Sequence, residues 1–293
     1  PHRPSRPPPP PPPPLVVTPT CPPSALLLWV PPPTTARPPV PHADVRRWKR
    51  FFFAWQCVQV AAVAYVGGTY AHDLQVTVYA TTIDVGPYVG THVPFPSTLT
   101  RVGDVSLFWL YVQVPAWTAL HYLVTLCDWS AFVRALDVDH AYAVRWWEYG
   151  ISASLMTVTL AALCGVTTVA ALVNVGVATA AVQACGAVAE RRYAAGRSPW
   201  PAFTVGAVVF TASYGSTVVA SFARHRDDAP SFVVAVVVVT TLLYLLFPLV
   251  HVLYCTGTWS FRDADRAYDV LSLVSKAALD WLIVGGLVGW NTR

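Results

Sequence analysis

The sequence predicts an all-α membrane protein, a bundle of seven transmembrane helices. Of the 293 residues, 55% are hydrophobic and 12% are charged, whereas soluble domains carry about 25% charged residues. Several uncharged stretches reach the ~20 residues that a helix needs to cross a bilayer. They are rich in Ala, Leu and Val and lack the alternation of barrel strands, which favours helices over a β-barrel.

The uncharged stretches give the order of the spans along the chain. They cover residues 51–72, 105–127, 149–189, 198–223 and 229–261, and a last apolar run follows at 267–290. The stretch at 149–189 has 41 residues, about twice the length of one span. We therefore expect two helices here, joined by a tight turn near Cys164, Gly165 and Thr167, which brings the number of spans to seven.

The sequence divides into a proline-rich tail and a membrane domain. Residues 1–44 form a predicted disordered cytoplasmic tail, because 19 of the 27 prolines lie within residues 1–41 and such a segment cannot build a core. Residues 45–293 form the predicted membrane domain.

The first loop between spans, residues 73–104, predicts an extracellular β-hairpin. Its segment 75–82 reads QVTVYATT, which is rich in β-branched residues with partial alternation. The turn formers Gly86, Pro87 and Gly90 follow it.

The basic residues predict the orientation in the membrane. If the amino terminus is inside, eleven Lys and Arg residues lie on the inner side and four on the outer side. Because positive residues accumulate on the cytoplasmic side, we expect a cytoplasmic amino terminus and an extracellular carboxy terminus. The formal net charge of +4 then reflects topology and requires no nucleic-acid partner.

One of only two lysines, Lys276, lies in the middle of the last apolar run. A lysine at the centre of a bilayer costs about 2.5 to 3.5 kcal/mol. An amine in a dry pocket is a good nucleophile toward an aldehyde, so a Schiff base to a carbonyl ligand, retinal in a membrane, explains its presence. Two alternatives stay open: Lys276 snorkels to an interface, or it pairs with Asp280 in a protein without a chromophore.

One of only two glutamates, Glu148, supplies the charge that such a lysine needs. It lies in the motif RWWEYGISASLM, where Glu148, Ser152 and Met156 share one helix face at i, i+4 and i+8. A carboxylate there can keep a protonated imine charged. The alternative is a local ion pair with Arg145, three residues earlier.

The last span carries a second polar stripe. Ser272 precedes Lys276 by one helical turn, and Asp280 follows it by one turn. Asp280 is either a second acid near the lysine or a residue that faces the outer headgroups.

Together with LSLVSKAALDW near the carboxy end, the motif RWWEYGISASLM resembles the heliorhodopsins. This is a retinal-binding family with seven helices, an inverted orientation and a long first extracellular loop. The resemblance covers about Trp48 to Trp290. It implies retinal on Lys276 as a protonated Schiff base, Glu148 as counterion, and Ser272 and Ser152 as neighbours. It also implies all-trans retinal in the dark, a homodimer in membrane lipid, and a signalling partner that the sequence does not name.

The resemblance also concerns a histidine in the second span. His121 lies where the family places a histidine that helps to receive or share the proton; the alternative is a core histidine with a satisfied hydrogen bond. Heliorhodopsins often bring a second histidine from the first span, where this chain has Gln56 and Gln59.

The sixth span resembles the aromatic clamp that microbial rhodopsins place around the polyene. Tyr244, Phe247 and Pro248 have the spacing of that clamp, with His251 where an aromatic residue is common. We expect the first three to line the pocket. The alternative is plain helix packing in which Pro248 kinks the helix.

The predicted function is light sensing in sensory transduction, and we expect no enzyme activity. Microbial pumps resemble this layout but carry a second carboxylate about two helical turns beyond the counterion, where this chain has Leu155. We expect light to isomerise retinal, move the imine proton away from Glu148 and change helix packing. The alternative is a light-gated proton channel or transporter, whose path would use the polar groups Glu148, His121, Asp280 and Glu190.

Overall fold

The computed structural model describes residues 42–70, 75–83, 97–227 and 229–291. The predicted disordered tail up to residue 41 and the turn formers Gly86, Pro87 and Gly90 lie outside these ranges.

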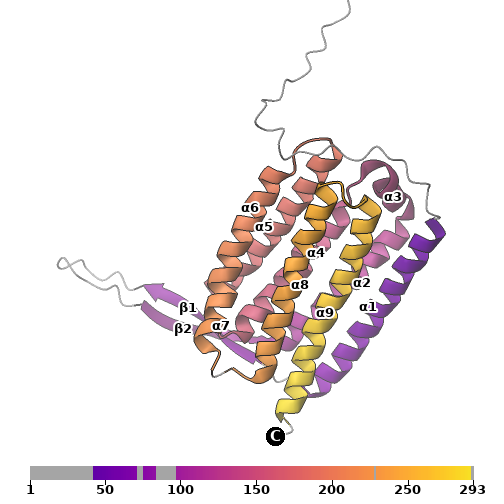
Figure 1. Cartoon of the computed structure of the whole chain (residues 1–293). Coiled ribbons are helices and arrows are strands. Elements are labelled where there is room, and N and C mark those ends of the chain that lie inside the picture. The colour runs from indigo at the N-terminus through magenta and orange to yellow at the C-terminus, as the bar shows by residue number, and fades with distance from the viewer. Residues whose placement is uncertain (1–41, 71–74, 84–96, 228, 292–293) are drawn as a thin grey trace, which may run out of the picture.

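The described chain forms a bundle of seven long helical rods, as predicted (Figure 1). The rods are α1 (His42–Tyr70), α2 (Leu107–Cys127), α4 (Ala143–Leu163), α5 (Val169–Ala194), α6 (Trp200–Tyr214) with its continuation, α8 (Ser231–Cys255) and α9 (Phe261–Asn291). The π-helical turn η3 (Gly215–Val219) continues α6 into α7 (Ala220–His225), so these three elements form one rod. Short α3 (Trp129–Arg134) and η2 (Ala135–Asp139) connect α2 to α4.

Four rods are long and apolar enough to cross a membrane by length and composition alone: α1, α5, the α6–α7 rod and α8. The other three, α2, α4 and α9, complete the bundle and bring polar side chains to its interior, among them Thr118, Glu148 and Lys276. The chain is an integral multi-pass membrane protein.

The 41-residue apolar stretch divides where the sequence predicts. Helix α4 ends at Leu163 and α5 begins at Val169. Gly165 has φ +85° in the turn between them, a left-handed conformation that glycine adopts without a steric cost.

The predicted β-hairpin is present as β1 (Gln75–Ile83) and β2 (Ser97–Ser106), which pair antiparallel with a bulge between Val78 and Tyr79. The Tyr79 N–H donates a hydrogen bond of 2.9 Å to the carbonyl of Thr167, in the α4–α5 turn. The hairpin therefore hangs from one end of the bundle, which we call the hairpin end (Figure 1). The opposite end carries α3 and is called the α3 end.

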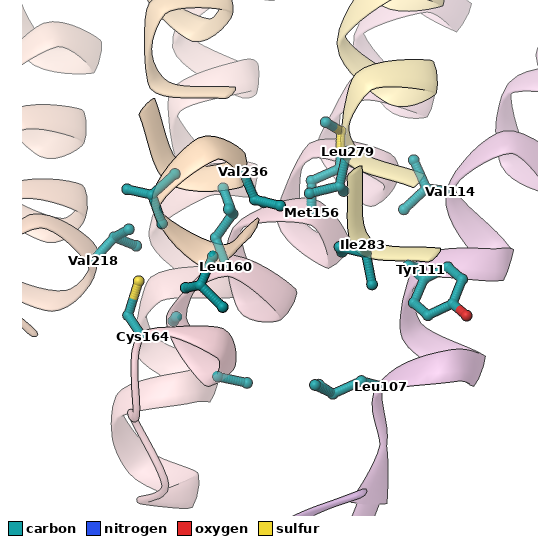
Figure 2. Close-up of a cluster of buried hydrophobic side chains, with 14 of the residues drawn as sticks. Leu107, Tyr111, Val114, Met156, Leu160, Cys164, Val218, Val236, Leu279 and Ile283 are labelled. Carbon is teal, nitrogen blue, oxygen red and sulfur yellow. The ribbon is translucent and has the colours of Figure 1, made fainter. Parts of the chain in front are cut away.

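The two halves of the core differ in chemistry. The hairpin half is filled by apolar side chains from all seven rods, including Leu107, Met156, Leu160, Val236 and Ile283 (Figure 2). The α3 half holds an aromatic cluster and most of the buried charges. The candidate site lies where these halves meet.

Candidate functional site

Lys276 is held inside the bundle by three polar partners. Only 2% of its surface is exposed, and its Nζ donates to Glu148 Oε1 at 2.5 Å, Thr118 Oγ1 at 2.6 Å and Ser272 Oγ at 2.8 Å. Lys276 is therefore not a snorkelling lysine. Its ion pair is with Glu148 on α4, and the structure shows none with Asp280 on its own helix.

Glu148 shares one oxygen between two donors and leaves the other free. Its Oε1 accepts from Lys276 and from Thr118 Oγ1, the latter at 2.8 Å, while Oε2 has no hydrogen-bond partner among the described residues. The alternative local pair with Arg145 is not formed, because the Arg145 guanidinium binds Glu190 and Asp265.

Thr118 is the member of this site that sequence reasoning missed. Its hydroxyl also lies 3.1 Å from the carbonyl of Val114, a bond that threonine commonly makes inside apolar helices. The available signal was its position three residues before His121, which places both on one face of the second span.

His121 and Ser152 are buried beside the ion pair without bonding to it. His121 Nδ1 and Ser152 Oγ both lack a hydrogen-bond partner within the described ranges. The His121 ring packs edge-on against Tyr122 and Tyr142. In α1, neither amide atom of Gln56 has a described partner, whereas Gln59 donates to Asp280 at 2.7 Å.

A cavity of about 270 Å³ lies next to Lys276, between α4, α5, α6, α8 and α9. Among the residues that sequence and resemblance point to, those that line it are Ser152, Met156, Tyr244, Phe247, Pro248, Ser272 and Lys276. Glu148 and His121 do not line the cavity. The other walls are mostly apolar and aromatic, including Trp146, Tyr149, Phe203, Phe210 and Tyr268.

The aromatic side chains that line this cavity pack against one another. Phe247 meets the Tyr149 ring edge-on at 5.6 Å and stacks on Tyr268 at 6.1 Å. His251 stacks on Phe203 at 5.7 Å, and its Nδ1 lies 3.2 Å from the Tyr268 hydroxyl. Helix packing and pocket formation, weighed as alternatives for the sixth span, therefore involve the same side chains.

Gly186 on α5 leaves space for the Trp146 ring, which lines the cavity from α4. A Cβ on Gly186 would lie 2.3 Å from the Trp146 ring, far inside contact distance. Only a residue without a side chain allows α5 to approach this ring so closely.

A network of buried charges lies on the α3 side of the ion pair, and sequence reasoning missed it. Lys49 Nζ binds Asp265 at 2.8 Å and Asp269 at 2.6 Å. Arg145 joins Asp265, at 3.0 Å, to Glu190 on α5. The spacing of Asp265 and Asp269 at i and i+4, in register with Ser272, was the signal in the sequence.

The comparisons with known proteins agree with this geometry. The family model described as Heliorhodopsin matches residues 45–288. The chain belongs to the heliorhodopsin family. Its fold is similar to that of a light-driven proton pump, LR (Mac) from Leptosphaeria maculans, with a TM-score of 0.60 and 16% identity over 85% of this chain and 96% of that chain. At this identity the likeness shows the rhodopsin fold alone. A comparison with curated proteins finds no match.

A heliorhodopsin is a photoreceptor-type protein with a retinal chromophore, and the residues here fit that group. A conjugated apolar ligand needs a dry pocket with mostly apolar walls and few, well-placed polar groups. The cavity has aromatic walls and a single lysine, whose Nζ is already paired with a buried carboxylate.

Proposed function

We propose that the chain is a light sensor in which retinal is linked to Lys276 Nζ and Glu148 balances the positive charge on that nitrogen. The observation that carries the proposal is the contact of 2.5 Å between Lys276 Nζ and Glu148 Oε1, beside an aromatic cavity. A lone ammonium in this place is costly, and a carboxylate at hydrogen-bond distance stabilises it.

The neighbouring side chains have separate tasks in this proposal. Ser272 and Thr118 hydroxyls fix the direction of Nζ toward α4. Tyr244, Phe247 and Pro248 form one wall of the cavity, so that a rigid polyene would have restricted freedom to rotate. When bound, retinal would supply a light-driven isomerisation that changes the direction of the N–H bond on Lys276.

The route from the site to the α3 end runs through α4. Arg145 lies one turn before Glu148 and joins α5 to α9 through Glu190 and Asp265. In this proposal the proton moves onto Glu148, rather than away from it as expected from the sequence, and so removes a negative charge one turn away from this guanidinium. We infer that the charge network at the α3 end changes in response, which would alter the packing of α4, α5 and α9.

A second candidate is a light-gated proton channel or transporter. Buried Asp280, on the hairpin side of Lys276, favours it, because it extends the line of ionisable groups across the bundle. Against transport, α4 carries no further carboxylate between Glu148 and its end at Leu163. Voltage-clamp recording under light separates the two: a sustained current supports transport, and no sustained current supports the sensor.

Orientation and assembly follow from the sequence and the family. We propose a cytoplasmic amino terminus and an extracellular carboxy terminus, from the distribution of basic residues. All-trans retinal in the dark, a homodimer in lipid and a signalling partner are proposed from family resemblance.

The decisive test is reconstitution. The full chain is expressed with all-trans retinal, and visible spectra are recorded before and after treatment with hydroxylamine in light. We expect a visible band that requires retinal and bleaches. Folded protein without any such band would rule out the proposed function.

A further inference from the structure

Asp280 is a buried acid that the proposed function leaves without a role. It lies on α9, one turn from Lys276 toward the hairpin end, and is 0% exposed, so it does not face the headgroups. Its Oδ2 accepts a hydrogen bond from Gln59 Nε2 at 2.7 Å, and its Oδ1 has no described partner.

No cation among the described residues pairs with Asp280 alone. Lys276 is the charged group that acts on it, and the ammonium of Lys276 already binds Glu148. The polar neighbours from the other helices are neutral: Gln59 on α1, which donates to Asp280, and Tyr111 on α2. One cation facing two carboxyl groups leaves one negative charge too many.

A buried carboxylate without a counter-charge takes up a proton rather than remain ionised. The side chains between Asp280 and the hairpin end also disfavour an ionised carboxylate. They form an apolar cluster that includes Leu107, Leu279 and Ile283 (Figure 2). Within the described residues, helix α8 adds Val233 and Val236 to the same cluster. These surroundings favour a protonated Asp280, one helical turn from Lys276.

We propose that Lys276 Nζ works between two carboxyl groups in opposite protonation states, and that light exchanges these states. In the dark, Glu148 is ionised and Asp280 is a neutral acid. In the lit state, Glu148 carries the proton that Nζ gave up, and Asp280 has given its own proton to Nζ. This inference rests on the proposed function and adds a second proton-transfer partner to it.

The exchange is balanced in bonds and charge. The N–H bond on Nζ breaks as an O–H bond forms on Glu148, and the O–H bond on Asp280 breaks as a new N–H bond forms on Nζ. The three groups carry −1, +1 and 0 before the exchange and 0, +1 and −1 after it. No proton has to enter or leave the protein, so the apolar cluster at the hairpin end is no obstacle.

The first test needs no retinal. Infrared spectra of the retinal-free protein should contain the C=O stretch of protonated carboxylic acids, and Asp280→Asn should remove one component of it. The control is Asp227→Asn, which changes a side chain that is 96% exposed and should leave that stretch unchanged. If Asp280→Asn leaves every component of the stretch intact, Asp280 is ionised and the proposal is wrong. Because Asn can still accept from Gln59, circular dichroism should show a folded variant.

The second test uses the protein with retinal. Light-minus-dark infrared spectra should show the loss of the Asp280 acid band and the gain of a different acid band from Glu148. Asp280→Asn should abolish the loss, whereas Asp280→Glu should restore it at a shifted frequency. A fast voltage clamp should record a transient charge displacement that reverses in the dark, with no sustained current.

The two proposals fail in different ways. A visible pigment whose difference spectrum is the same with and without Asp280→Asn would overturn the exchange and leave the sensor proposal standing. No pigment at all would overturn the sensor, whatever the retinal-free spectra show.

Discussion

Lys276 and Lys49 are both buried, but their surroundings give them different roles. Lys49 Nζ binds two carboxylates and lies 4.9 Å from the centre of the Phe132 ring, so it is fully engaged in packing. Lys276 binds one carboxylate and two hydroxyls and borders the cavity. Only the second has both a free neighbouring space and a partner for a positive charge.

The covalent link should depend on Lys276 alone. Lys276→Ala should abolish the visible band completely, because no other lysine borders the cavity described. Lys49→Arg, which keeps the buried charge, should retain the band. A Lys276→Ala protein with a covalent visible chromophore would show that the link is elsewhere.

Glu148→Gln should change the colour of the pigment. Without the carboxylate, the nitrogen of Lys276 loses its proton more readily, and the fraction that stays protonated should absorb at longer wavelength. Asp280→Asn should leave the dark band almost unchanged, since it replaces one neutral group by another. Titration of both variants, followed by visible spectroscopy, makes the comparison. If only Asp280→Asn shifts the band, the counterion lies on α9.

At the scale of single residues, sequence reasoning worked where a polar group interrupted an apolar run. Lys276, Glu148 and Ser272 stand out in this way, and the structure brings them together. Thr118 does not stand out, because threonine satisfies its hydroxyl on the preceding turn in many apolar helices. Its bond to Glu148 depends on how α2 and α4 pack, which no local pattern encodes.

Among the elements, α4 carries two charges with separate tasks one turn apart. Arg145 ties α4 to α5 and α9, while Glu148 serves the lysine. Breaking a buried ion pair leaves the partner charges uncompensated, whereas an exposed pair contributes little.

Arg145→Gln should therefore destabilise the protein by about 3 to 5 kcal/mol. Thermal loss of the visible band, or of helical circular dichroism, measures this change. The matched control is Arg134→Gln, at a side chain that is 74% exposed and 3.6 Å from Asp139, which should cost less than about 1 kcal/mol. Equal stability of the two variants would contradict a role for the buried network.

Gly186→Ala should damage the cavity by moving a neighbour. Its Cβ would lie 2.3 Å from the Trp146 ring and must displace that ring, an overpacking that costs about 1 to 3 kcal/mol. We expect a lower yield of pigment at a given retinal concentration. Gly150→Ala is the control, because a Cβ there meets nothing within 4 Å. A normal yield from Gly186→Ala would mean that α5 shifts freely.

Helix number and order were predictable, but three helix starts were not. The uncharged stretches begin at residues 51, 149 and 267, whereas α1 begins at His42, α4 at Ala143 and α9 at Phe261. The extra turns contain Lys49, Arg145 and Asp265, and both cations pair with Asp265 inside the bundle. Reading spans by the absence of charge shortens helices whose charges neutralise one another.

For the whole molecule, charge is distributed unevenly between the two ends of the bundle. Buried basic and acidic side chains pair toward the α3 end, and apolar side chains fill the core toward the hairpin end. If the α3 end is cytoplasmic, a tag on the amino terminus should be shielded in intact cells and a tag after Arg293 should be accessible. Protease or antibody access to the two tags measures this, and the reverse pattern would contradict the proposed orientation.

The β-hairpin is attached to the helical bundle in a way that would amplify a movement of α4. Its nine-residue first strand reaches about 30 Å at the rise of extended chain. The strand is fastened near its middle to the turn between α4 and α5, by the bond from Tyr79 to Thr167. A small tilt of α4 would thus displace the ends of the strand, outside the bilayer, by more than it displaces the point of attachment. A spin label on exposed Leu99, paired with a second label on the helical bundle, would record that movement as a light-dependent change in the distance between the two labels.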